Sequence, residues 1–250
     1  MTLYPLNVHR HASRRDLGVA AAATAAEAVR AAIDARGTAR IMLAAAPSQS
    51  ETLAALAALA ASEGIDFSKV VAFHMDDYIG LPTDAPQGFG NWLVANFTDL
   101  LPAQPDLRRM DTTGDAVAAA AAYAQAMGDE PFDVTLCGLG VNGHLAFNDP
   151  PADFGDPLAA RVVELDSVSR QQQVDEGHFP TYDDVPAQAV TVTIPRLLNT
   201  KVVVCSVPGE PKRQAVADTI ALDPDPNHPG TALKTHPNVH LFIDAESSPA

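Results

Sequence analysis

The sequence is poor in cysteine, in basic residues and in long apolar runs, and each shortage excludes a class of protein. Two cysteines in 250 residues fit no disulfide framework, and they favour a reducing, cytoplasmic setting. Sixteen Lys and Arg against 31 Asp and Glu give a net charge of −15, which disfavours nucleic acid and anionic membranes as partners. No stretch approaches the roughly 18 apolar residues of a membrane span. We therefore expect a globular protein with a small-molecule partner.

Near the N-terminus, residues 13–26 resemble a twin-arginine export signal, with paired arginines before a small apolar run. The run is mostly alanine, however, and Glu27 and Arg30 interrupt its continuation. We favour an ordinary helix over about residues 14–35. Its expected inward face consists of Leu17, Ala21, Ala25, Val29 and Ile33.

Strand-like apolar runs alternate with alanine-rich helical runs along the chain. This order predicts one three-layer, Rossmann-like α/β domain over residues 1–250, with a mostly parallel sheet and helices on both faces. The expected strands are 40–45, 69–75, 132–140, 189–194, 201–207 and 238–244, and the expected helices are 51–64, 89–101, 116–128 and 211–220. Residues 150–186 interrupt the pattern with a stretch rich in Pro, Asp and Gln, which we interpret as an inserted lid or small subdomain.

Three strand ends carry polar residues at the edge where α/β sheets bind their ligands. The first is "AAAPSQSET", where Ser48, Gln49 and Ser50 precede a helix whose free N–H groups favour an anion. Capping of the helix by a serine is the simpler alternative. The loop lacks the glycines of a nucleotide-binding P-loop.

The second strand end is "FHMDDYIGLP", in which two carboxylates follow a strand. Strand alternation turns Asp76 and Asp77 to opposite sides, so one faces the ligand crevice and the other makes structural contacts. A turn or a helix cap is the alternative explanation of this acidic pair.

The third strand end is "CGLGVNGHLAFNDP", where Gly140 and Gly143 permit a tight turn and close approach to a ligand. His144 is a candidate general acid or base, oriented by Asp149 or Asn142. For a lone histidine, a buried structural role is the alternative.

A fourth feature is Lys212, one of only four lysines, at the expected start of a helix. A cation beside free N–H groups indicates an anion between them, whereas a solvated surface lysine is the alternative.

Taken together, "FHMDDYIGLP", "GLGVNGHLAFNDP", "VPGEPKRQAV" and "TALKTHPNVHLFID" resemble the glucosamine-6-phosphate deaminase/isomerase family and, more distantly, the 6-phosphogluconolactonases. The resemblance implies conversion of glucosamine 6-phosphate and water to fructose 6-phosphate and ammonia, without a cofactor or metal. It implies that Asp76 is the general base and that His144 opens the sugar ring, aided by Asn142 and Asp149. The residues implied in substrate and phosphate binding are Ser48, Gln49, Ser50, Asp77, Gly140, Gly143, Arg170 and Lys212.

The chain departs from the family pattern at three places. Asn142 stands where the family often has Asp, and Asp149 replaces the commoner Glu. The phosphate loop "T-G-x-T-P" is replaced by "AAPSQS", and a lid arginine is missing, with Arg170 and His178 as candidate replacements. The chemistry at carbons 1 and 2 is therefore predicted more firmly than the group at carbon 6.

Three other functions remain alternatives: a lactonase that hydrolyses a sugar-acid ester, a sugar-phosphate sensor without activity, and a metal-dependent hydrolase. The "MDDY" block disfavours the lactonase, which needs no base at carbon 2. The hydrolase would use His74, Asp76 and His144, but no repeated ligand motif is present. The oligomeric state is left open, with a homo-oligomer as one alternative.

Overall fold

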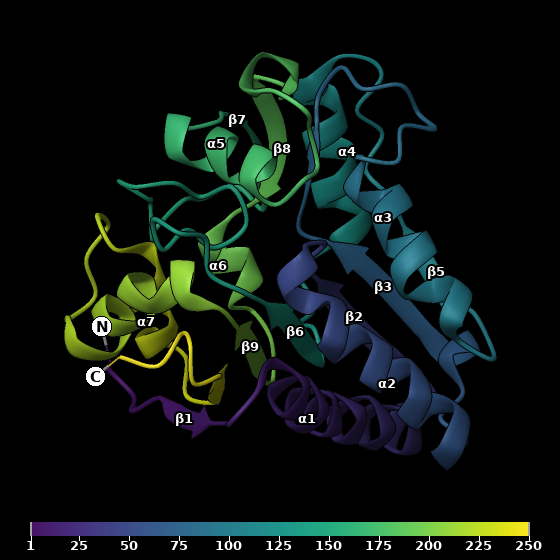
Figure 1. The fold of residues 1–250 in the computed structure, drawn as a ribbon. Helices are drawn as coiled ribbons and strands as arrows, with labels where there is room; N and C mark the ends of the chain where they lie inside the picture. Colours follow the sequence, from purple (N-terminus) through teal and green to yellow (C-terminus); the bar gives the residue numbers. More distant parts are fainter. Residues whose placement is uncertain (1, 250) are drawn as a thin grey trace.

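A seven-stranded sheet forms the centre of the fold (Figure 1), and the computed structural model describes residues 2–249. The strand order is β1-β10-β9-β6-β2-β3-β5, and all neighbouring pairs are parallel. The strands are β1 (Asn7–Arg10), β2 (Ala39–Leu43), β3 (Val70–His74), β5 (Asp106–Arg108), β6 (Val134–Cys137), β9 (Val203–Val207) and β10 (Val239–Ile243). The central strands are continuous apolar runs, as a sheet covered on both faces requires.

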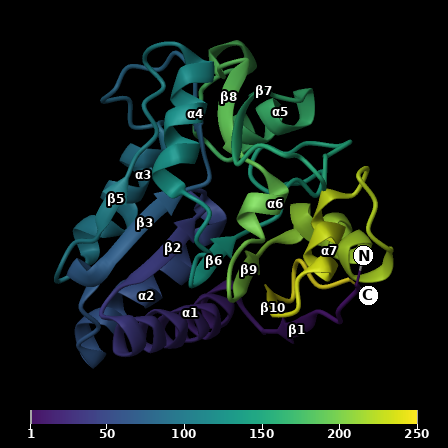
Figure 2. The same ribbon diagram turned by 180° about the vertical axis from the view of Figure 1, so that it is seen from behind.

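Helices cover both faces of this sheet (Figures 1 and 2). One buried apolar cluster contains side chains of α1 (Arg14–Arg36), α2 (Ser50–Glu63) and α3 (Phe89–Asn96). The other contains those of α4 (Ala116–Met127), α6 (Ile194–Leu197) and α7 (Arg213–Ala221). Short 3-10 helices lie at Pro47–Gln49, Phe67–Lys69, Thr98–Leu100, Tyr182–Asp184, Glu210–Lys212 and Pro229–Thr235. The predicted three-layer α/β fold class is confirmed.

The first helix, α1, spans almost exactly the residues predicted for it. Its first turn is capped by Ser13, whose Oγ accepts a hydrogen bond from Asp16 N at 3.1 Å, and Gly37 ends it with φ +78°. Arg14, one of the paired arginines, binds Glu51 on α2 at 2.7 Å. Within residues 2–249, no helix combines the length and the apolar character that crossing a membrane would require.

A second, three-stranded antiparallel sheet lies beside the main one, in the order β4-β8-β7. Its strands are β4 (Asp76–Tyr78), β8 (Gln188–Val192) and β7 (Ala160–Glu164). The sequence placed residues 189–194 in the main sheet, and that prediction was wrong. An apolar run marks a buried strand, but it carries no information about which sheet the strand joins.

The segment 150–186 supplies β7 and the helix α5 (Ser167–Asp175). It therefore shares the small sheet with β4, the strand that begins at Asp76. In Figure 1, α5 and the strands β7 and β8 lie above the ends of the central strands of the main sheet.

The strand order reverses direction between β2 and β6. From β2 the chain builds outward through β3 to β5, then returns to β6 and continues through β9 to β10. In open α/β sheets, such a switch point leaves a crevice at the carboxyl ends of the strands, where ligands bind. The loops that start at Ala44 and Gly138 leave β2 and β6 at this crevice.

Candidate active site

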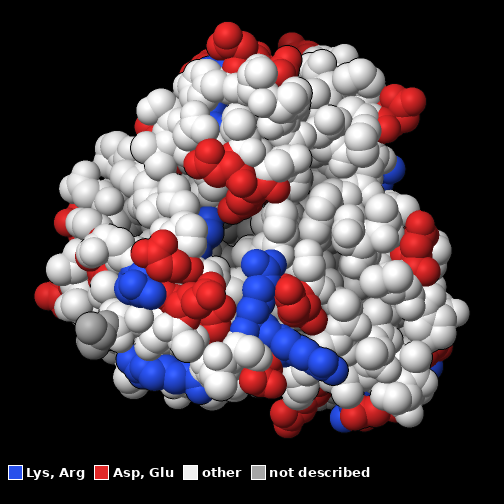
Figure 3. All heavy atoms as spheres, in the orientation of Figure 1, with Lys and Arg blue, Asp and Glu red and all other residues white. Residues whose placement is uncertain are grey.

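A pocket opens at the switch point, and Figure 3 shows this face of the molecule hollowed beneath the segment that carries α5. The loops after β2, β3 and β6 line it, together with α5 and the residues just before α7. Of the predicted site residues, those in its lining are Ser48, Gln49, Asp76, Gly140, His144 and Lys212. Those outside the lining are Ser50, Asp77, Asn142, Gly143, Asp149 and Arg170.

The adjacent carboxylates Asp76 and Asp77 have different environments, as strand alternation predicts. The Asp77 carboxylate accepts hydrogen bonds from three backbone N–H groups, those of Tyr78 (2.9 Å), Phe89 (3.0 Å) and Gly90 (3.2 Å). The last two belong to the first turn of α3, so Asp77 holds that helix in place. The expectation that Asp77 binds substrate does not match this geometry.

The Asp76 carboxylate lines the pocket, and it accepts no hydrogen bond from any residue between 2 and 249. Burial raises its pKa well above the usual carboxyl value, and the neighbouring charge of Asp77 raises it further. A carboxylate that binds a proton more tightly than usual is suited to accept one from carbon.

His74 is a structural residue. Its Nδ1 lies 2.8 Å from the carbonyl oxygen of Asp76, and its Nε2 accepts a hydrogen bond from Met110 N at 3.0 Å. The second bond fixes the proton on Nδ1. Because both ring nitrogens bind backbone groups, His74 has no free nitrogen for the metal site considered from the sequence.

His144 lies against Gly140, and the contact requires glycine at that position. A Cβ atom on residue 140 would lie 2.3 Å from the imidazole ring. The backbone closes the loop as well, because Gly140 N donates to His144 O at 2.9 Å. Gly143 adopts φ +83°, the left-handed region that favours glycine. The two glycines therefore shape the loop, and only Gly140 reaches the pocket.

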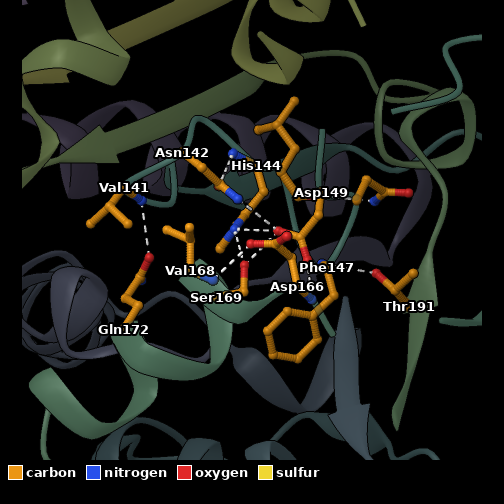
Figure 4. Close-up of polar contacts among 12 residues, drawn as sticks. Val141, Asn142, His144, Phe147, Asp149, Asp166, Val168, Ser169, Gln172 and Thr191 are labelled. Atoms are coloured by element: carbon orange, nitrogen blue, oxygen red, sulfur yellow. Dashed lines mark hydrogen bonds and ion pairs between the residues drawn. The ribbon is translucent and has the colours of Figure 1, made fainter. Parts of the chain in front are cut away.

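Asp149 lies behind His144 and collects three hydrogen bonds on one oxygen (Figure 4). His144 Nδ1 and Asn142 Nδ2 each lie 3.0 Å from Asp149 Oδ1. Burial opposes ionisation of Asp149, but the bonds from His144, Ser169 and Asn142 outweigh it and hold its pKa well below the usual value. Asp149 is therefore the charged partner that orients the imidazole.

Asn142 acts on His144 indirectly. Its side-chain amide donates to Asp149, and its Oδ1 accepts a hydrogen bond from the backbone N of His144 at 3.1 Å. No contact joins the Asn142 amide to the imidazole ring among the described hydrogen bonds. A second carboxylate at this position would face Asp149 at hydrogen-bond distance, so Asn142 and Asp149 form a compatible pair.

Ser169, which was not predicted as a site residue, completes the imidazole environment. Its Oγ lies 2.8 Å from His144 Nδ1 and donates to Asp149 Oδ1 at 2.5 Å. The residue is fully buried on α5, so it links the inserted segment to the loop after β6 (Figure 4). The contacts of Nδ1 with Asp149 and Ser169 turn this nitrogen away from the pocket, so Nε2 is the ring nitrogen that can reach a ligand.

We expect Ser169→Ala to lower kcat/KM about tenfold, the effect of one lost hydrogen bond to a charged group. Ser167→Ala is the matched control, since Ser167 lies on the same helix with an exposed side chain. Equal values of kcat/KM for the two variants would remove Ser169 from the site.

The other end of the pocket contains Ser48, Gln49 and Lys212. Neither serine caps α2: Ser50 is its first residue, and the side chain at the N-cap, Gln49, makes no capping bond. Instead, Gln49 Nε2 donates to Ser48 Oγ and to Ser206 O, both at 3.1 Å. Lys212 is buried, and its Nζ lies 3.2 Å from Glu176 Oε1.

The two candidates for the missing lid arginine lie away from this end. Arg170 donates to the carbonyl oxygens of Tyr182 (3.0 Å) and Val185 (2.8 Å) and stacks on the Tyr182 ring. His178 packs edge-on against Phe89, with ring centroids 6.2 Å apart. Neither residue lines the pocket. The prediction that Arg170 or His178 replaces the arginine is not supported, because Arg170 binds carbonyl groups within the inserted segment and His178 packs against Phe89 on α3.

The parallel sheet brings a carboxylate and an oriented imidazole together at its switch point, which is where enzymes with this kind of α/β fold bind their substrates. Residues 12–241 match the family described as glucosamine-6-phosphate isomerases/6-phosphogluconolactonase, and the chain belongs to this family.

Comparisons with individual proteins agree with this assignment. The glucosamine-6-phosphate deaminase of Streptococcus pneumoniae serotype 4 is 31% identical over 183 residues, which cover 73% of this chain and 77% of the relative. A solved monomeric glucosamine-6-phosphate deaminase superposes with a TM-score of 0.89 at 26% identity, covering 97% of this chain and 98% of the other. A 6-phosphogluconolactonase from Shewanella baltica OS155 shares the fold at 17% identity, with a TM-score of 0.78 and coverage of 98% and 100%.

Proposed function

We propose that the protein is a deaminating aldose–ketose isomerase of 2-amino sugars. In the reaction that its relatives' names indicate, glucosamine 6-phosphate and water give fructose 6-phosphate and ammonia. The observation that carries the proposal is one pocket lined both by Asp76, a carboxylate without a partner among residues 2–249, and by an oriented imidazole, His144.

His144 opens the sugar ring in this proposal. With Nδ1 held by Asp149 and Ser169, Nε2 takes the proton of the hydroxyl at carbon 1 and delivers it to the ring oxygen. The bond between carbon 1 and the ring oxygen breaks, and the open-chain aldehyde forms. The ionised Asp149 stabilises the imidazole while it carries the additional proton.

Asp76 then moves a proton between two carbons. It takes the proton from carbon 2, and the electron pair moves to the oxygen on carbon 1, leaving the enolate form of an enolamine. It then returns a proton to carbon 1, while the amino nitrogen passes one proton to that oxygen, so that carbon 1 becomes an alcohol and carbon 2 an imine. Water adds to the imine and ammonia leaves, which yields the ketose. The sugar's own carbonyl accepts the electron pair, so the proposed steps need no cofactor. They take place at carbons 1 and 2 and do not depend on the substituent at carbon 6.

We further propose that residues 150–186 act as a lid over these steps. Helix α5 presents Gln172 and Gln173 to the pocket, and Gln173 Oε1 accepts a hydrogen bond from the buried Tyr78 at 2.6 Å. An enolamine exposed to bulk water exchanges protons and hydrolyses, so a covered pocket favours the isomerisation.

The experiment that tests the proposal measures ammonia release from glucosamine, galactosamine and their 6-phosphates, without added metal or nucleotide. We expect ammonia from at least one of the four sugars, with solvent deuterium incorporated at carbon 2 of recovered substrate. Hydrolysis of 6-phosphogluconolactone without ammonia release would establish the lactonase alternative. Binding without either reaction would establish the sensor.

A further inference from the structure

In the part of the pocket formed by the end of α5 and the residues just before α7, the single cation is neutralised by a carboxylate. Lys212 is the only Lys or Arg that lines the pocket within residues 2–249. Its side chain is 7% exposed, and its Nζ lies 3.2 Å from Oε1 of Glu176, whose side chain is 19% exposed. The pair therefore brings no net positive charge to this part of the pocket.

Glu176 is held in this position by its own helix. It caps the C-terminus of α5, and its Oε1 accepts a second hydrogen bond, at 2.8 Å, from Gln172 Nε2. The Gln172 amide is fixed in turn, because its Oε1 accepts from Val141 N at 2.9 Å. Two donors converge on one carboxylate oxygen, which shows that the charge belongs to the pocket and is not a solvated surface group.

Gln49 adds a second acceptor to the lining of the same pocket. Its Nε2 donates to the carbonyl oxygen of Ser206 at 3.1 Å, and a carbonyl only accepts, so the orientation of the amide is fixed. Its Oε1 is buried and has no hydrogen-bond partner within the described chain. A buried acceptor without a partner costs free energy that a ligand hydroxyl would recover by donating to it.

These groups match a hydroxyl better than a phosphate. A phosphate monoester carries a charge of about −1.5 to −2 at pH 7 and offers acceptors almost exclusively. A phosphate would face two acceptors, the Glu176 carboxylate and the Gln49 oxygen, to which it cannot donate. The one lysine that could donate to the phosphate is already paired with Glu176. A hydroxyl donates to one of these oxygens and accepts from Lys212.

We propose that Glu176 is a specificity-determining residue that selects a hydroxyl over a phosphate at carbon 6, so that the preferred substrates are unphosphorylated 2-amino-2-deoxyhexoses. This inference rests on the proposed deaminase chemistry at carbons 1 and 2. Figure 3 shows acidic side chains above the hollow and basic side chains at its left and lower edges.

The test compares kcat/KM for glucosamine and glucosamine 6-phosphate, followed by ammonia release. We expect the wild type to use glucosamine at least as well as its 6-phosphate. In Glu176→Gln, the ratio of phosphate to free sugar should rise at least about tenfold, because a like charge no longer opposes the phosphate. Asp175→Asn is the matched control, since it removes an exposed carboxylate one residue away. It should leave the ratio within about twofold.

Titration with inorganic phosphate by calorimetry keeps this inference separate from the proposed function. We expect phosphate to bind Glu176→Gln at least about tenfold more tightly than the wild type. If neither sugar releases ammonia, the proposed function fails. The titration still shows whether Glu176 opposes phosphate binding. A wild-type preference for the 6-phosphate would overturn the substrate class, and equal phosphate affinities would overturn the role of Glu176.

Discussion

Asp76→Asn is expected to lower kcat by about 10²- to 10⁴-fold and to stop deuterium exchange at carbon 2. The amide has almost the same shape as the carboxylate but accepts no proton. Substrate binding should change little, since the variant keeps the size and polarity of the side chain. Persistent exchange at carbon 2 would show that another residue is the base.

The neighbouring aspartate provides the control for this variant. Asp77→Asn removes the charge that accepts the N–H groups of Phe89 and Gly90 at the start of α3, so it should cost about 1 kcal/mol of folding stability. Asp76→Asn should not destabilise the protein. A pKa raised in the folded state means that the Asp76 carboxyl favours folding only at low pH, and this contribution is lost as the pH rises through the raised value.

Thermal unfolding at pH 7 therefore separates the two aspartates. We expect the midpoint of Asp76→Asn to equal or exceed that of the wild type, and the midpoint of Asp77→Asn to fall by about 2–4 °C. An ordinary carboxyl group titrates near pH 4. Because the pKa of Asp76 is raised, we expect the acidic limb of the kcat/KM profile to lie at a higher pH than this. A limb that is unchanged in an active Asp76 variant would contradict the assignment.

Gly140→Ala is expected to lower kcat/KM by about 10²-fold, although it adds only a methyl group. The new Cβ would lie 2.3 Å from the His144 ring, so the imidazole must leave its place on Asp149 and Ser169. His144→Gln should lose a similar factor. The double variant should be no worse than either single one, because both changes remove the same imidazole. Gly114→Ala is the control, since a Cβ there meets nothing within 4 Å.

A substrate without a ring shows whether the imidazole acts at the ring-opening step. A 2-amino aldehyde too short to form a pyranose should exchange its carbon-2 proton at similar rates in the wild type, Gly140→Ala and His144→Gln. Equal losses on cyclic and short substrates would place His144 in the proton transfer at carbon 2 instead.

The strand ends could be predicted from the sequence because apolar runs locate them, and residues just after them meet at one edge of the sheet. Asp76 and His144 follow β3 and β6 in this way, and Asp149 lies close along the same loop. Strand alternation predicted that only one of Asp76 and Asp77 faces the pocket and that the other makes structural contacts. The sequence offered a helix cap as the alternative for this acidic pair, but it could not show that Asp77 is the residue that caps and α3 the helix that is capped.

The residues on α5 could not be predicted from the sequence. The helix is polar on all sides, so no apolar periodicity marks the face turned inward. Ser169 and Glu176 gave no signal for this reason, and Arg170 was chosen because it is the nearest cation to the missing one. Its side chain instead satisfies backbone carbonyl oxygens within the inserted segment.

Helix α5 carries both Ser169, which contacts the imidazole, and Glu176, which contacts Lys212, so the phase of this one helix positions both contacts. Ser169, Gln172, Gln173 and Glu176 follow the spacing i, i+3, i+4, i+7, which places one stripe over the pocket. Inserting or deleting one residue rotates everything beyond it by about 100°. A length change between Ser169 and Glu176 would keep the imidazole contact and bring a different side chain to Lys212. Evolution can thus exchange the group recognised at carbon 6 by shifting the phase of one helix, without substituting any residue of the reacting centre.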